Sequence, residues 1–179
     1  MNSVIDISRA KNIYGQMDEE ELLWLSETAS RCKIIAELGC FHGRSTRALA
    51  DHSPGVVYAV DDWHWQENNP HNSFSEFRFN LEDHIDKSKV IIVPIRHEDA
   101  EIFYNEKSFD MIFLDGDHEY QAVRRDIRLA LPHMNKGGIL CGHDYSEKRF
   151  PGVVRAVNEL LPQAKKVTNT ELAIWAAIL

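Results

Sequence analysis

The sequence predicts an α/β fold: a doubly wound sheet of seven strands, mostly parallel, with an antiparallel C-terminal strand. Short apolar runs of strand length alternate with amphipathic stretches of helical length through most of the chain. This alternation is typical of right-handed crossovers between parallel strands. The last stretch, residues 165–179, instead holds two strand-like runs separated by a short polar turn. Strands joined by so short a turn run antiparallel to each other.

The individual elements follow from local patterns. Apolar residues spaced three and four apart predict helices that begin near residues 18, 74, 120 and 151, and a further helix is expected to begin at Ser45-Thr46, after a glycine turn. Asp18, with Glu21 three positions later, resembles a capping box at the start of the first of these helices, and Pro151 suits the first turn of the last. The strands before the terminal pair are expected at residues 34–36, 56–60, 90–95, 109–115 and 139–141.

Length and composition limit the possibilities. The 179 residues suffice for one domain, 1–179, but not for two. Asp and Glu outnumber Lys and Arg by 28 to 20, a formal net charge of −8, which argues against nucleic acid or a membrane as the main partner. The three cysteines lack C-x-x-C spacing, and the chain shows no signal-peptide core or membrane-length apolar run. A reduced, cytoplasmic setting is therefore expected.

The first strand–turn–helix–strand unit, residues 33–63, has the pattern of a cofactor pocket. Gly39 and Gly43 lie in its turn, where the lack of side-chain bulk lets a ligand approach the backbone and the N-terminus of the following helix. The second strand ends at Asp61, and an acid there can accept two hydrogen bonds from a ribose diol. These features together predict a pocket for an adenosine-containing cofactor.

Acidic residues also close several of the other predicted strands. Ligands of such sheets bind beyond the carboxyl ends of the parallel strands. The following side chains are therefore expected to line one crevice: Glu37, Asp61, Asp115 and Asp144.

Four ordered motifs resemble those of class I S-adenosylmethionine (SAM)-dependent methyltransferases. The chain is most similar to their small-molecule O-methyltransferase subgroup, which includes relatives of macrolide-sugar O-methyltransferases. The motifs are E-L-G-C-F-H-G-R-S-T at the first strand, V-Y-A-V-D-D-W at the second, D-G-D-H-E-Y-Q-A-V-R-R-D at the fourth and G-G-I-L-C-G-H-D-Y at the fifth. The resemblance covers roughly residues 17–179 and implies the Rossmann-like, seven-stranded fold of that class.

The resemblance implies SAM as the cofactor and assigns roles to individual residues. Asp61 would hold the ribose hydroxyls, Asp99 would contact the adenine amino group, and Asp115 would lie beside the sulfonium and the acceptor. Phe41 occupies the position between the two glycines. The full set of expected cofactor-binding residues is Glu37, Gly39, Phe41, Gly43, Ser45, Asp61, Asp62, Asp99 and Asp115.

Methyl transfer to a hydroxyl needs a base as well as alignment of the reactants. His118 and His143 are the candidates, since histidine can take up a proton near neutral pH, and Asp115 completes the expected catalytic set. Related enzymes bind a divalent cation at the ends of the fourth and fifth strands, where Asp115, His143 and Asp144 stand here. Magnesium or manganese is therefore a possible second cofactor, although a histidine departs from the usual oxygen ligands of hard cations.

Other functions stay open from the sequence. A nicotinamide-dependent oxidoreductase would need further glycines of the G-x-G-x-x-G fingerprint, and counting from Gly39, neither Phe41 nor Arg44 supplies one. A non-catalytic SAM-binding protein would look much the same as an enzyme. Oxygen is favoured over nitrogen as the methyl acceptor, because the Asn/Asp-Pro-Pro-aromatic tetrad of many N-methyltransferases is absent after the fourth strand.

The acceptor is expected to be a small molecule, but its site needs cover from outside the sheet. Residues 1–16, expected as an N-terminal arm, could supply it. So could residues 63–80, an aromatic-rich insertion expected over the acceptor site, or a second subunit in a homo-oligomer.

Overall fold

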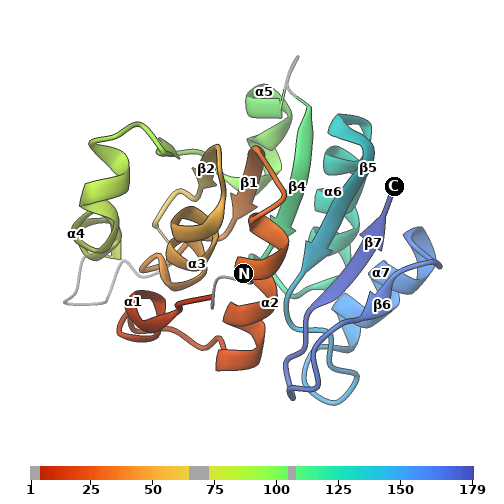
Figure 1. Cartoon of the computed structure of the whole chain (residues 1–179). Helices are drawn as coiled ribbons and strands as arrows, with labels where there is room; N and C mark the ends of the chain where they lie inside the picture. Colours follow the sequence, from red (N-terminus) through yellow and green to blue (C-terminus); the bar gives the residue numbers. More distant parts are fainter. Residues whose placement is uncertain (1–4, 65–72, 105–107) are drawn as a thin grey trace.

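The computed structural model describes residues 5–64, 73–104 and 108–179, and within them the predicted α/β fold is confirmed (Figure 1). The strands form one seven-stranded sheet in the order β3-β2-β1-β4-β5-β7-β6. Their bounds are Ile34–Leu38 (β1), Val56–Val60 (β2), Val90–Val93 (β3), Phe109–Leu114 (β4), Met134–Gly142 (β5), Lys165–Lys166 (β6) and Trp175–Ile178 (β7).

The strand directions determine where a site can form. β1 pairs in parallel with β2 and β4, β2 with β3, and β4 with β5. β7 is antiparallel to both of its neighbours, β5 and β6, so the predicted antiparallel C-terminal pair is confirmed. The carboxyl ends of the five parallel strands consequently lie along one edge of the sheet.

Helices cover both faces of the sheet, because successive residues of each strand point to opposite faces. Ile35 and its neighbours Val57 and Met111 pack into one core, while Ala36 and Ile112 pack into the other. No helix in the described part of the chain is long and apolar enough to cross a membrane. The first face carries α1 (Ser8–Lys11), α2 (Glu19–Ala29), α3 (Arg44–His52) and α4 (Ser73–Ile85), and the second α5 (Ala100–Tyr104), α6 (Tyr120–Ala130) and α7 (Pro151–Leu160).

Several strand boundaries differ from the prediction, and two of the differences have a clear local cause. β5 begins at Met134 rather than at residue 139, because the pair Gly137-Gly138, which resembles a helix stop, lies inside the strand. Gly137 has a φ of +79°, a value that glycine adopts without the strain a side chain would bring. β3 ends at Val93 instead of residue 95, since Pro94 has no N–H to donate to a ladder.

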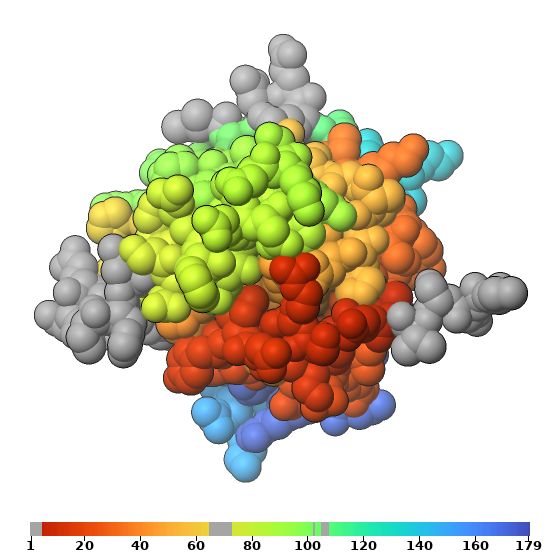
Figure 2. Space-filling view, turned by 60° about the vertical axis from the view of Figure 1, so that its left-hand side comes forward, coloured from red at the N-terminus to blue at the C-terminus, as the bar shows by residue number. Residues whose placement is uncertain are grey.

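The N-terminal arm is held against the helix that follows the glycine turn. Arg44, the first residue of α3, donates to the backbone oxygens of Lys11 and Ile13 at 2.7 Å and of Met17 at 3.0 Å. Figure 2 shows the N-terminal segment, in red, lying over α3 and beside α4. The arm expected from the sequence therefore contains α1 and is attached to α3. Residues 1–4 lie outside the described residues.

The expected insertion at residues 63–80 falls in two parts. Residues 65–72 lie outside the described residues, so their place over an acceptor site stays a prediction. Residues 73–80 belong to α4, whose Phe77 and Leu81 are fully buried in the first core. Trp63 packs its ring against Phe74 and Phe77, with centroid distances of 5.0 Å, so this part of the aromatic cluster contributes to the core.

A buried arginine connects α3 to α4. Arg47 has only 2% of its side chain exposed, and its guanidinium binds both carboxylate oxygens of Asp83 at 2.6 and 3.0 Å and Asp51 at 3.0 Å. Asp51 also lies 2.7 Å from Nε2 of His84. Arg9, more than half exposed, reaches the same Asp83 from α1 at 2.8 Å. The Arg47 contacts fix α4 against α3, next to the glycine turn.

Replacing Arg47 by Met should lower the free energy of unfolding by about 3 kcal/mol, because it leaves two carboxylates without their buried cation. Arg9→Met is the matched control, since it removes an exposed partner of the same Asp83 and should cost less than about 1 kcal/mol. Urea denaturation measures both changes. Equal losses in the two variants would show that burial of Arg47 does not matter.

Candidate functional site

The turn between β1 and α3 lies against the end of β4. Gly39 and Gly43 have φ values of +91° and +88°, and Phe41 between them has +47°. A Cβ atom on Gly39 would lie 2.0 Å from the backbone oxygen of Asp115, so no side chain fits there. A Cβ on Gly43 would lie 2.3 Å from Leu81, so this glycine also permits the packing of α4.

Asp61 holds the same turn from the end of β2. Its Oδ2 accepts the backbone N–H groups of Cys40 at 2.8 Å and Phe41 at 3.1 Å, and its Oδ1 accepts that of Trp63 at 2.7 Å. Asp61 therefore has a structural function that the sequence did not indicate, and its expected contact with a ribose stays a prediction. Its neighbour Asp62 lies 3.8 Å from the guanidinium of Arg96.

Glu37 lies inside β1, beneath the turn, and is completely buried. Neither of its carboxylate oxygens has a hydrogen-bond partner among the described residues. Burial raises the pKa of Glu37 to about 8, against the opposing effect of the nearby Ser45 and Thr46 hydroxyls. A buried carboxyl group without a partner costs free energy, so this position suits a ligand that brings a positive charge or a hydrogen-bond donor.

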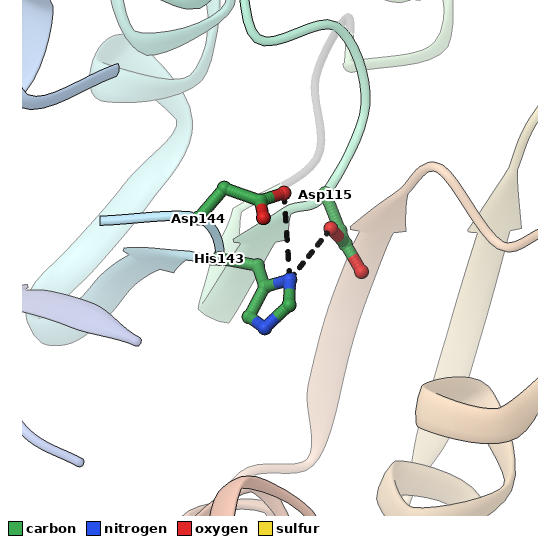
Figure 3. Close-up of side chains that lie close together, drawn as sticks. All are labelled: Asp115, His143 and Asp144. Atoms are coloured by element: carbon green, nitrogen blue, oxygen red, sulfur yellow. Dashed lines mark ion pairs between the residues drawn. The ribbon is translucent and has the colours of Figure 1, made fainter. Parts of the chain in front are cut away.

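Asp115, His143 and Asp144 come together at the ends of β4 and β5 (Figure 3). Nδ1 of His143 lies 3.4 Å from Oδ1 of Asp115 and 3.4 Å from Oδ2 of Asp144. One potential ligand atom from each of the three residues falls within 4.8 Å of the others. The three groups predicted as metal ligands are thus close enough to share one cation.

The charges of this cluster compensate one another. Burial opposes a charged imidazole, but the carboxylates of Asp115, Asp144 and Glu21 outweigh it and raise the pKa of His143 to about 12. Burial would raise the pKa of Asp144, yet the contacts with His118 and His143 hold it at about 2. At neutral pH the cluster therefore contains an imidazolium ion between ionised carboxylates.

His118 forms the outer side of the same cluster. Its Nε2 lies 2.7 Å from Oδ2 of Asp144, and 42% of its side chain is exposed. Its ring stacks on Phe150 with a centroid distance of 4.2 Å. The bond to Asp144 raises the pKa of His118. A cavity of about 20 Å³ beside it, lined in part by Asp115, His143 and Asp144, is large enough for one water molecule.

Glu21 belongs to this cluster, although its sequence pattern indicates only a helix cap. Its side chain is 1% exposed, and Oε2 lies 3.2 Å from Nε2 of His143. The predicted capping box with Asp18 is confirmed. The spacing between Asp18 and Glu21 contains no signal for a contact with a residue at the end of β5.

The remaining predicted residues lie around this edge of the sheet. Ser45 is buried in the first turn of α3. Asp99 is exposed at the last position of the short helix His97–Asp99, after β3. The glycine turn, Asp61, Asp115 and the histidine cluster are joined by the contacts described above, whereas Asp62 and Asp99 lie farther along the same edge, near the ends of β2 and β3.

Comparison with known proteins places the chain in a family. Residues 36–145 match a family model described as a methyltransferase domain. An uncharacterized protein of Acanthamoeba polyphaga mimivirus is 43% identical over 53 residues, which are 29% of this chain and 24% of that protein. The chain thus matches only about a quarter of the length of this curated relative.

Solved structures share the fold. Cofactor-bound Rv0187 from MTB has a TM-score of 0.75 at 16% identity, with 96% of this chain and 85% of that chain covered. An O-methyltransferase from Bacillus cereus in complex with SAH has a TM-score of 0.70 at 20% identity, with 95% of this chain and 86% of that chain covered. An O-methyltransferase family protein from Burkholderia thailandensis has 0.66 at 13% identity, and the match covers 87% of this chain but 54% of that one.

The family match begins within β1 and extends past the end of β5, and so includes the glycine turn, Asp61, Asp115, His118 and the His143-Asp144 pair. The fold around it has the strand order and the antiparallel β7 described above. On this evidence the chain belongs to the methyltransferase domain family.

Proposed function

We propose that this protein transfers the methyl group of SAM to a hydroxyl oxygen of a small molecule. The observation that carries the proposal is the buried Glu37 carboxyl beneath a glycine turn, which has no hydrogen-bond partner in the described part of the chain, in a member of the methyltransferase domain family. An amino acid ammonium group, such as that of SAM, would supply the missing partner.

The described residues fit SAM along the edge of the sheet. Glu37, Gly39, Phe41, Gly43 and Ser45 would surround its methionine part. The acids beyond β2, Asp61 and Asp62, would receive the ribose, and Asp99 the adenine. SAM supplies a methyl group that its sulfonium already activates. The protein then has to align the acceptor oxygen with that methyl group, a task for Asp115 at the end of β4.

The two histidines take different roles in this proposal. His143 is 4% exposed and enclosed by Glu21, Asp115 and Asp144, so it contributes a fixed positive charge to the site. His118 is more accessible and is oriented by Asp144 through Nε2. We assign His118 as the general base, which would take the acceptor proton at Nδ1.

A divalent cation at Asp115, His143 and Asp144 is the second candidate for activating the acceptor. The convergence of their ligand atoms supports it. One nitrogen and two carboxylate donors fit Mn²⁺ better than Mg²⁺. Such a cation would lower the pKa of an acceptor hydroxyl. The cation would have to displace the proton that His143 holds between two carboxylates. For this reason we rank metal activation below the general base His118.

The other properties of the proposal follow from charge and cysteine chemistry. The net charge of −8 supports a small-molecule acceptor over nucleic acid. Three buried free cysteines support a reducing, cytoplasmic location. A homo-oligomer would add cover to the acceptor site.

The family match argues against the nicotinamide-dependent oxidoreductase. A non-catalytic SAM-binding protein is the remaining alternative.

SAM should bind the purified protein in a calorimetric titration, and NAD should not. Asp61→Asn should weaken SAM binding by about tenfold to a hundredfold, because the ribose would lose a charged acceptor and the turn would lose part of the hydrogen bonding that holds it. Asp62→Asn, the adjacent control, should change it less; the reverse order would assign the ribose to Asp62. Mass spectrometry of a metabolite extract incubated with SAM then tests for a methylated product, which a purely SAM-binding protein would not form.

Binding of SAM at pH 7 should release about one proton, because Glu37 holds its proton in the ligand-free protein and would lose it opposite an ammonium group. Calorimetry in buffers of different ionisation enthalpy measures this release. Glu37→Gln should bind more weakly and release none from this position. Proton release that is unchanged in the variant would remove Glu37 from the SAM site.

The raised pKa of Glu37 also predicts how the stability of the ligand-free protein depends on pH. Its pKa rises from an ordinary 4.5 to about 8 on folding, so between these pH values the folded state binds one proton more than the unfolded state. The unfolding free energy should therefore fall as pH rises through this window. Glu37→Gln should lack this part of the decline in urea denaturation at pH 5 and pH 8. Parallel pH curves for both proteins would contradict the prediction.

Methyl transfer should persist after dialysis against EDTA, since His143 already supplies a positive charge between Asp115 and Asp144. The rate of SAH formation with and without added Mn²⁺ measures this. Loss of activity on chelation and its recovery with Mn²⁺ would instead assign the three residues to a metal site.

A further inference from the structure

The first turn of α2 places a buried carboxylate against the imidazole of the histidine cluster. Oε2 of Glu21 accepts the backbone N–H of Asp18 at 2.8 Å and lies 3.2 Å from Nε2 of His143. Its other oxygen, Oε1, accepts the hydroxyl of Thr170 from the turn between β6 and β7. One side chain thus joins three segments that are distant in the sequence.

Helix capping alone does not account for this arrangement. A capping-box glutamate has only to reach back to the N-cap N–H, which an exposed side chain can do. Glu21 is 1% exposed, and burying a carboxylate is costly unless charges and donors compensate it. His143 and Thr170 provide that compensation and hold the pKa of Glu21 below its ordinary value, although burial acts to raise it.

A partner for Nε2 would fix the orientation of the His143 ring. Figure 3 shows Nδ1 directed toward Asp115 and Asp144 and the opposite nitrogen, Nε2, directed away from both. The two contacts of Nδ1 are long, at 3.4 Å each, so by themselves they define the orientation of the ring only weakly. An imidazole is oriented when both nitrogens have defined partners. Glu21 is placed to be the second partner, as an ion pair whose alignment falls short of a hydrogen bond.

We propose that Glu21 is a positioning residue, which holds the His143 ring so that Nδ1 faces the gap between Asp115 and Asp144. The contact between Glu21 and His143 is independent of the proposed function. Only the role of this contact, the alignment of the methyl-transfer site, rests on it. Through Thr170, the same contact connects the β6–β7 turn to that site. Helix α2 then contributes to the chemistry of a cluster whose other members come from the ends of β4 and β5.

Three variants separate positioning from capping. Glu21→Met has a similar size but removes the acceptor for both Asp18 and His143. Glu21→Gln keeps one oxygen, which at the position of Oε2 can face both partners, so it should rescue the ring position. Asp18→Ala is the matched control, because it removes the N-cap side chain of α2 and leaves Glu21 in contact with His143. The readouts are crystal structures and the ring signals of His143 in protein labelled with ¹³C and ¹⁵N at histidine, all at one pH.

In Glu21→Met the His143 ring should rotate or occupy two orientations, with new ring signals. Asp18→Ala should keep the wild-type ring and signals even where it lowers thermal stability as much. Glu21→Gln should keep the orientation but shift the signals, since a neutral amide replaces the carboxylate. Wild-type orientation and signals in Glu21→Met would overturn the proposal, as would an equal change in Asp18→Ala.

Two further measurements keep the test decisive if Glu21→Met does not fold or if SAM does not bind. If Glu21→Met does not fold, Glu21→Gln decides, because ring signals identical to those of the wild type would rule out the contact. SAM affinity should stay within about threefold of wild type in Glu21→Gln and Asp18→Ala. Failure of every protein to bind SAM would count against the proposed function, whereas the ring comparison would still test the role of Glu21.

Discussion

The close approach of the β1–α3 turn to the end of β4 is the constraint on which the site depends. Gly39 lies so near the backbone of Asp115 that a Cβ atom would meet it at 2.0 Å. Asp61 binds the same turn through the N–H groups of Cys40 and Phe41. These contacts hold the ends of β2, β1 and β4 together, and the side chains that follow these strands face one another at a single edge.

The electrostatics of that edge follow from burial. Carboxyl groups brought together away from water cannot all stay ionised without cations between them. Asp144 has two histidines as partners and stays ionised, with a pKa of about 2. Glu37 is completely buried without a hydrogen-bond partner among the described residues, and burial raises its pKa to about 8. The site thus combines an ionised cluster at the ends of β4 and β5 with a protonated acid beneath the glycine turn.

The sequence predicted most elements because their signals are local. The capping box at Asp18 and the proline at the start of α7 both occupy the expected positions. The boundary of β5 could not be predicted in the same way. Gly137-Gly138 resembles a stop, and only the neighbouring strands show that the chain continues through it as a strand. A local pattern contains no information about the partner that supplies hydrogen bonds.

The sequence by itself determined the order of strands and helices, the glycine turn and the acids at the edge of the sheet, because parallel strands end at the same side whatever their partners are. Only the tertiary structure decided which groups touch. It turned Asp61 toward the backbone of the turn, paired His118 with Asp144 and brought Glu21 to His143. Such contacts depend on the distances and directions between elements far apart in the chain, which hydrophobic periodicity and motif spacing do not specify.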